Sequence, residues 1–205
     1  MSDRVTFLTL QLQIKYMQDI LKTIQNRRAV YPAMYKDQEI SQEALNQIFE
    51  ASRWAPNHRK TEPWRYIAFH SESARKQLSE YLGKRYEEVY TGEKYSAAKH
   101  KKVQKKVLQS GCVLAIIFPR DEAERVPEWE EIAALACSVQ NMWLQASSMG
   151  IGSYWSSPSM ITSGAESFFE LKENERCMGL FYLGHWDPIE LPAERRAWEE
   201  FVEMK

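Results

Sequence analysis

The sequence predicts an α+β fold, with a few strands in the middle of the molecule and helices around them. Segments of helical period alternate with short apolar runs along the chain. Residues 112–118 (CVLAIIF) are apolar without interruption, as expected for a central strand that is covered on both faces. No internal repeat, low-complexity tract or linker interrupts the 205 residues, so we expect a single domain over residues 1–205.

A change in the spacing of apolar residues marks the first two predicted elements. Residues 8–14 alternate Leu or Ile with Thr or Gln, which predicts a strand or an arm within residues 1–14. From Lys15 onward the apolar residues fall on one helical face. Ser41 is expected to cap the next helix, because a serine side chain accepts a hydrogen bond from the first helical turn.

A strand is expected at residues 64–70, followed by two polar helices at 72–90 and 94–109. The second helix is very basic, and its lysines are Lys94, Lys99, Lys101, Lys102, Lys105 and Lys106. Such a charge run either attracts an anionic ligand or is simply a solvated helix face, which is the commoner situation.

A long helix is predicted after Pro127, over Glu128–Met149, and most of its sides are apolar. A helix of this kind is buried in a large core or in a subunit interface. Gly150 is placed to end it, as glycines commonly do just beyond a helix. Short strands are expected at 151–157 and 178–185, with a small helix between them.

Composition excludes several classes of protein. The net charge of -1 lacks the basic footprint of a nucleic-acid-binding protein. No apolar run approaches the length of a membrane span, and the N-terminus has no signal-peptide pattern. Three widely spaced cysteines (Cys112, Cys137 and Cys177) are expected to be buried free thiols in a reducing compartment, so we expect a cytoplasmic protein.

Familiar catalytic and cofactor motifs are missing from the sequence. It has no glycine-rich dinucleotide or phosphate-loop fingerprint, and Gly150-Ile151-Gly152 is too short to count as one. It also has no nucleophile elbow and no histidine cluster that could hold a metal ion. The chemistry must therefore come from segments that are far apart in the sequence.

The loop from Trp54 to Tyr66 (WAPNHRKTEPWRY) is the segment richest in functional groups. The residues before its two prolines are biased toward extended geometry, which predicts a rigid, irregular loop. Its aromatic rings, amide and imidazole suit a flat ligand with polar edges. Alternatively, the loop is a turn whose tryptophans fill the core.

Two pairs of adjacent arginines are candidates for binding a phosphate. Arg27 and Arg28 follow the first helix, and Arg195 and Arg196 lie near the C-terminus. Forked guanidinium donors match phosphate oxygens well. Taken singly, however, each pair is more often a solvated surface feature.

The order of these segments resembles the nitroreductase family of FMN-dependent flavoproteins. The matching segments, in chain order, are Arg27-Arg28-Ala29, Ala55-Pro56-Asn57-His58, Glu62-Pro63-Trp64, Gly150-Ile151-Gly152, Phe181-Tyr182-Leu183-Gly184 and Arg195-Arg196. The stretch Val126-Pro127-Glu128-Trp129-Glu130 resembles the small YdjA-like bacterial subgroup. The resemblance covers about residues 20–203, and the ordered set is more specific than any one motif.

This resemblance implies a mostly antiparallel central sheet flanked by helices, and a homodimer with FMN at the interface between the two chains. It also implies a lid over the flavin from residues 84–110. The implied FMN-binding residues are Arg27, Arg28, Ala29, Trp54, Asn57, His58, Trp155, Ser156, Ser157, Arg195 and Arg196. Among them, Arg27 and Arg195 would hold the phosphate.

Two positions depart from the family pattern. Ala29 replaces a serine, and Tyr31 stands where many members have a lysine near the flavin N1 atom, although the YdjA-like subgroup also lacks that lysine. His58 or Arg28 is expected to take over the electrostatic role.

The activity that the resemblance implies is hydride transfer from NADH or NADPH to the flavin, and then to an electron-poor acceptor such as a nitroaromatic, a quinone or an activated alkene. The lysine-rich helix at 94–109 favours NADPH, which carries the extra phosphate. No catalytic side chain is required, although His58 is a candidate proton donor. Other functions remain open: a non-catalytic FMN store or redox sensor, reductive dehalogenation or flavin breakdown on the same fold, and an interaction module without flavin.

Overall fold

The computed structural model describes residues 20–191 and 193–205. The predicted arm at residues 1–14 lies outside this range, and residues 20–26 are helical, as expected. The remaining helices are α2 (Gln42–Ser52), α3 (Glu72–Val89), α4 (Ala97–Leu108), α5 (Glu128–Ser148) and α6 (Ser159–Thr162). Short 3-10 turns are η1 (Pro32–Met34), η2 (His58–Lys60), η3 (Gly92–Lys94) and η4 (Trp198–Glu200).

The sheet has four strands in the order β1-β2-β4-β3, and every neighbouring pair is antiparallel. The strands are β1 (Arg65–Phe69), β2 (Cys112–Pro119), β3 (Ile151–Ser156) and β4 (Glu175–His185). The apolar run predicted to be a central strand is β2, and its first seven residues are buried. The predicted α+β class and the mostly antiparallel sheet are therefore confirmed.

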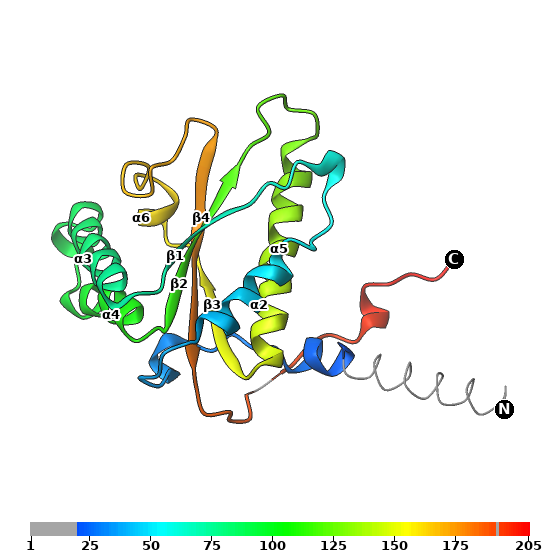
Figure 1. Cartoon of the computed structure of the whole chain (residues 1–205), viewed down its shortest axis with the longest axis horizontal. Helices are drawn as coiled ribbons and strands as arrows, with labels where there is room; N and C mark the ends of the chain where they lie inside the picture. The colour runs from blue at the N-terminus through cyan, green and yellow to red at the C-terminus, as the bar shows by residue number, and fades with distance from the viewer. Residues whose placement is uncertain (1–19, 192) are drawn as a thin grey trace.

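Helices cover both faces of this sheet (Figure 1). Alternate residues of β2 point to opposite faces, as the period of a strand requires. Val113 packs in a core with residues of α3, α4 and α6, whereas Leu114 packs in a second core with residues of α2 and α5. The sheet thus separates two hydrophobic layers.

Two helix ends have the predicted capping residues. The Ser41 hydroxyl accepts a hydrogen bond from the Ala44 N–H at 3.2 Å, which starts α2. Gly150 has φ of +71° just after α5, a conformation that glycine adopts at little cost. The start of the basic helix differs from the prediction: α4 begins at Ala97, not at residue 94, because the Ser96 side chain caps it.

Strand β4 starts earlier than predicted, at Glu175 instead of residue 178. Arg65 of β1 donates two hydrogen bonds to the Glu175 carboxylate, at 2.8 and 2.7 Å. This pair lets a buried carboxylate sit in the strand, because its oxygens are hydrogen-bonded. Burial alone would raise the pKa of Glu175, but the hydrogen bonds outweigh it and the pKa lies below its ordinary value.

Helix α5 is buried against the sheet on one side only. Leu135, Val139 and Met142 are buried, whereas Ala133 and Ala136 are exposed and Trp129 is 69% exposed. The sequence predicts that the helix is buried in a core or in a subunit interface. The core covers one face of α5, and its apolar outer face remains uncovered in the single chain. The C-terminal segment leaves the body of the fold on the same side as α5 and ends away from the sheet (Figure 1).

Candidate functional site

The segment that follows the first helix, residues 27–31, runs beside the outer edge of β3. Ala29 forms an isolated parallel bridge with Ser153, and the Val30 N–H donates to the Ser153 carbonyl at 3.0 Å. The Trp143 indole N–H donates to the carbonyl of Arg28 at 3.1 Å. These bonds fix the backbone of the first predicted arginine pair against the sheet and α5.

Arg27 lies among positive charges. Its guanidinium stands over the Trp143 ring, 4.6 Å from the ring centroid. Burial lowers the pKa of Arg27, and the nearby guanidiniums of Arg195 and Arg28 lower it further. Within residues 20–191 and 193–205, no carboxylate forms an ion pair with Arg27, Arg28 or Arg195. Like charges held together without a counter-charge are typical of an anion-binding site.

The second predicted arginine pair is divided by the fold. Arg195 lies close enough to Arg27 to affect its pKa. Arg196 instead stands over the ring of Phe201, 5.7 Å from its centroid. The structure therefore joins one arginine of the C-terminal pair to the first pair.

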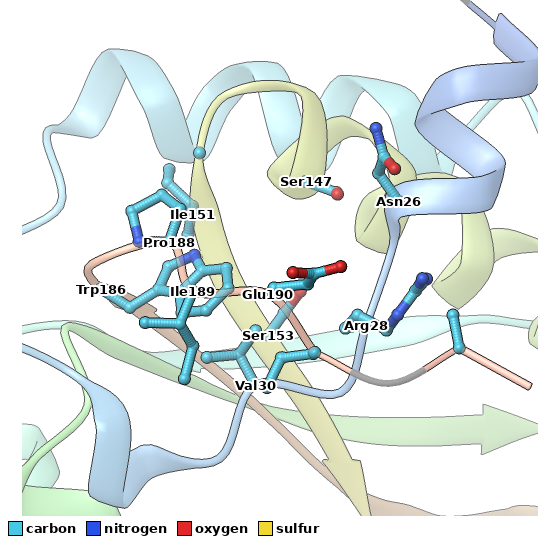
Figure 2. A pocket seen from close by; sticks show the side chains of 13 residues that line it. Asn26, Arg28, Val30, Ser147, Ile151, Ser153, Trp186, Pro188, Ile189 and Glu190 are labelled. Carbon is cyan, nitrogen blue, oxygen red and sulfur yellow. The ribbon is translucent and has the colours of Figure 1, made fainter.

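A cavity of about 760 Å³ lies on the Arg28 side of this segment. The first helix, α5, β3 and the segment after β4 contribute to its wall, and Figure 2 shows Asn26, Arg28, Ser147 and Glu190 around it. Arg28 Nε and Ser153 Oγ are buried and have no hydrogen-bond partner among the described residues. Since an unpaired buried polar group is costly, by about 1–3 kcal/mol, these two atoms indicate a place for polar ligand atoms.

The predicted segment Trp155-Ser156-Ser157 begins at the end of β3, next to this site. The Trp155 indole N–H donates to the carbonyl of Met178 at 3.0 Å, which holds the ring against β4. Gly179 makes the close approach possible: its φ is +121°, and a side chain there would put a Cβ atom 2.5 Å from the Ser156 carbonyl oxygen. Trp155 and Ser156 thus lie on β3 just beyond Ser153, the residue that bridges to the arginine segment.

The loop rich in functional groups, residues 54–66, is irregular, as predicted, but the extended geometry expected before Pro63 is wrong, because Glu62 has a positive φ. The Asn57 side-chain oxygen accepts a hydrogen bond from the Glu62 N–H at 3.2 Å, across the loop. Arg59, Lys60 and Glu62 have positive φ values, of 53°, 55° and 44°. Such conformations cost energy and often occur at functional sites.

The alternative in which the loop's tryptophans fill the core is wrong for Trp54. Its side chain is 73% exposed, and its indole N–H donates to Glu50 at 2.9 Å. Trp64 is partly buried against the core on the α5 side, so the alternative describes that residue only. His58 is also accessible, and its Nδ1 lies 2.7 Å from a carboxylate oxygen of Glu130.

One chain does not bring the two halves of the predicted site together. His58 contacts Glu130 near the start of α5, whereas Arg27 stacks on Trp143 near its end. At 1.5 Å per residue, residues 130 and 143 are roughly 20 Å apart along the helix axis. Asn57 and His58 are thus away from the arginine cluster. Trp54 instead shares a groove with the first helix, which leads into Arg27, and with the second half of α5.

Trp143 and Ser153 contact the segment of the first arginine pair, and the sequence did not predict either of them as a candidate. Trp143 was one apolar residue among many in the long helix, and nothing local marks its indole N–H as the partner of Arg28. The importance of Ser153 depends on its bridge to Ala29, which no local pattern predicts.

The expectation of three buried thiols is wrong for Cys137, which is exposed on α5, while Cys112 and Cys177 are buried.

Other kinds of site find no support among the described residues. In residues 20–191 and 193–205, no group of three or more His, Cys, Asp or Glu side chains could hold a metal ion. The same part of the chain contains no helix with the length and apolarity of a membrane span.

Several known proteins are similar to this chain in sequence. The protein named "Putative NAD(P)H nitroreductase YfhC", from Bacillus subtilis, is 28% identical over 193 residues, which cover 88% of this chain and 92% of that protein. YdjA of Escherichia coli, whose name has the same form, is 25% identical over 167 residues, covering 81% of this chain and 87% of its own.

Solved structures agree on the fold. A nitroreductase-like family protein from Bacillus cereus superposes with a TM-score of 0.78 at 23% identity, covering 91% of this chain and 95% of its own. A nitroreductase from Desulfovibrio desulfuricans, solved in complex with FMN, gives a TM-score of 0.68 at 21% identity and covers 91% and 96%. The model of the Nitroreductase family matches residues 24–185, which include the first arginine pair, the loop and all four strands. This chain belongs to the nitroreductase family.

Proposed function

We propose that this protein is an FMN-dependent oxidoreductase that transfers a hydride from NAD(P)H to an electron-poor acceptor such as a nitroaromatic, a quinone or an activated alkene. The observation that carries the proposal is the grouping of Arg27, Arg28 and Arg195 with no carboxylate partner among the described residues. Membership of the family, and a relative of the same fold solved with FMN, support the choice of flavin as the anionic ligand.

The residues present fit FMN. Arg27 and Arg195 would hold the phosphate dianion, which would offset the repulsion between them. The unpaired Arg28 Nε and Ser153 Oγ offer hydrogen bonds to the ribityl hydroxyls. Trp155, Ser156 and Ser157 would then flank the ring, because Trp155 and Ser156 follow Ser153 along β3 and Ser157 comes directly after the strand.

We further propose that a second copy of the chain completes each site. The exposed apolar face of α5, with Trp129, Ala133 and Ala136, suits an interface between two copies. In a two-fold dimer, the same surface of each chain meets its counterpart. Asn57 and His58 of one copy would then reach the arginine cluster of the other, which a single chain does not achieve.

The side chains of this site bind and orient; they do not need to supply acid–base catalysis. When bound, FMN supplies the hydride chemistry, so the protein's task is to position the reactants and exclude water. Glu130 holds the His58 ring through Nδ1, and a carboxylate partner favours the proton on that nitrogen. The His58 Nε2 atom is then left to exchange a proton with the product.

The experiment that tests the proposal is an absorbance spectrum of the purified protein, followed by addition of NADPH or NADH without air. A visible flavin band that bleaches on addition is the expected result. A flavin band that neither nucleotide bleaches would overturn the reductase function and favour a flavin store or a redox sensor. A colourless protein that also takes up no added FMN would overturn the assignment of the site.

Light scattering on the same sample tests the second copy. We expect a mass of about two chains, and loss of FMN when the protein is diluted into monomers. A monomer that retains FMN would overturn the shared site and leave the flavin assignment intact.

A further inference from the structure

A second groove, of about 710 Å³, lies between η1 and α4. Tyr31 and Tyr154 form one side of it. The other side is one face of α4, with Lys101, Lys102, Lys105 and Lys106. Its volume is in the range of small-molecule sites. Residues 84–110, predicted to be a lid, therefore supply a positively charged wall of this groove.

The charge of this wall has no counterpart nearby. None of the four lysines forms an ion pair within residues 20–191 and 193–205, and no Asp or Glu lines the groove. The neighbouring helix α3 is different, since its Arg85 pairs with Glu88 at 2.7 Å.

The arrangement within α4 also disfavours an ordinary solvated face. Lys101 and Lys105 are four residues apart on the helix, where like charges repel. The lysines of the last turn gain from the helix dipole, but Lys101 lies in the middle of the helix and does not. An anionic ligand in the groove would offset this repulsion.

The groove adjoins the proposed flavin site. Tyr31 belongs to the segment that carries Arg27, and its ring lies 4.6 Å from that of Tyr154, centroid to centroid. Lys106 Nζ is 5.4 Å from the Tyr154 ring centroid, and the next residue, Trp155, starts the segment proposed to flank the flavin. A ligand in the groove can therefore extend toward the flavin ring.

We propose that this groove binds the adenosine 2′-phosphate of NADPH and makes the protein prefer NADPH to NADH, an inference that rests on the proposed function. The two nucleotides differ only in that phosphate, which carries about two negative charges near neutral pH. The lysines match its charge, and the Tyr31 ring offers a face on which adenine can stack.

Calorimetry tests the groove without relying on the flavin reaction. The full-length protein is titrated with adenosine 2′,5′-bisphosphate and with adenosine 5′-monophosphate. The test variant is Lys101→Gln/Lys105→Gln. The matched control is Lys76→Gln/Lys84→Gln, which removes two exposed lysines of α3 outside the groove. We expect the bisphosphate to bind more tightly than the monophosphate, and the test variant alone to weaken bisphosphate binding about tenfold.

Anaerobic reduction of the flavin provides the second measurement. The ratio of NADPH to NADH reduction rates at low nucleotide concentration should fall about tenfold in the test variant and stay constant in the control. Equal reduction rates with both nucleotides, or bisphosphate binding that the test variant leaves unchanged, would each overturn the inference. If no nucleotide reduces the flavin, the proposed function fails, and calorimetry alone decides whether the groove binds the 2′-phosphate.

Discussion

Replacing Arg27 by glutamine separates a ligand-binding role from a structural one. In the protein without ligand, the change removes a charge that Arg195 and Arg28 repel, and it also removes the contact over Trp143. A cation–π contact contributes about 0.5–1 kcal/mol at such sites, so the two effects oppose each other. We expect the free energy of unfolding to change by less than about 1 kcal/mol.

FMN binding should respond much more strongly. Hydrogen bonds between a guanidinium and a phosphate contribute about 1.5–3 kcal/mol, so Arg27→Gln should weaken FMN binding by about 10- to 150-fold. Flavin fluorescence titration of the FMN-free protein measures this affinity, and urea unfolding of the same sample measures stability.

Two further variants sharpen the result. Arg27→Lys keeps the charge but loses the forked donor, so its affinity for FMN should lie between those of the unmutated protein and Arg27→Gln. Arg196→Gln should weaken FMN binding less than Arg195→Gln does, because the Arg196 guanidinium lies over the ring of Phe201. Unchanged FMN affinity in Arg27→Gln would refute the anion site. A loss of several kcal/mol in the FMN-free protein would show instead that Arg27 holds the fold together.

Three other predictions concern packing, acid stability and the interface. Gly184→Ala would place a Cβ atom 2.3 Å from Tyr35 Cδ2, so urea unfolding should show a loss of about 1–3 kcal/mol, and an unchanged midpoint would contradict this packing. The pKa of Glu175 is lowered in the folded protein, so the ionised carboxylate stabilises the fold. This stabilisation is present above the ordinary carboxyl pKa and is lost as the pH falls through the lowered pKa. In Glu175→Gln the urea midpoint should therefore depend less on pH below about pH 5, and parallel curves for the two proteins would refute this. Ala136→Arg should give monomers that lose FMN and in which Cys137 reacts with a thiol reagent. If Cys137 reacts equally in the unmutated protein, the outer face of α5 is not covered by a second copy.

The sequence predicted the elements whose causes are local. Ser41 starts α2 because its own hydroxyl accepts the Ala44 N–H, and seven consecutive buried residues give β2 its uninterrupted apolar run. Gly150 ends α5 through a backbone conformation that depends on one residue. Each of these signals can be read within a few positions of the chain.

What the sequence could not predict depends on distant pairings. β4 begins at Glu175, before its predicted start, and the guanidinium of Arg65 makes the burial of this carboxylate tolerable. The resemblance to a family assigned Arg27 and Arg195 to one phosphate, whereas composition alone left each pair as a surface feature. The separation of His58 from Arg27 became evident only when α5 was seen to contact them near opposite ends.

The short bridge between Ala29 and Ser153 links ligand binding to the solubility of the protein. β3 is an outer strand of the sheet, and the segment that carries Arg27 covers part of its free edge through the Val30 N–H bond. An uncovered strand edge is a template for pairing with another chain, so whatever loosens this segment also raises the tendency to aggregate. An anion bound to Arg27 tethers the segment, and loss of the ligand should therefore make the protein aggregate more readily as well as inactivate it.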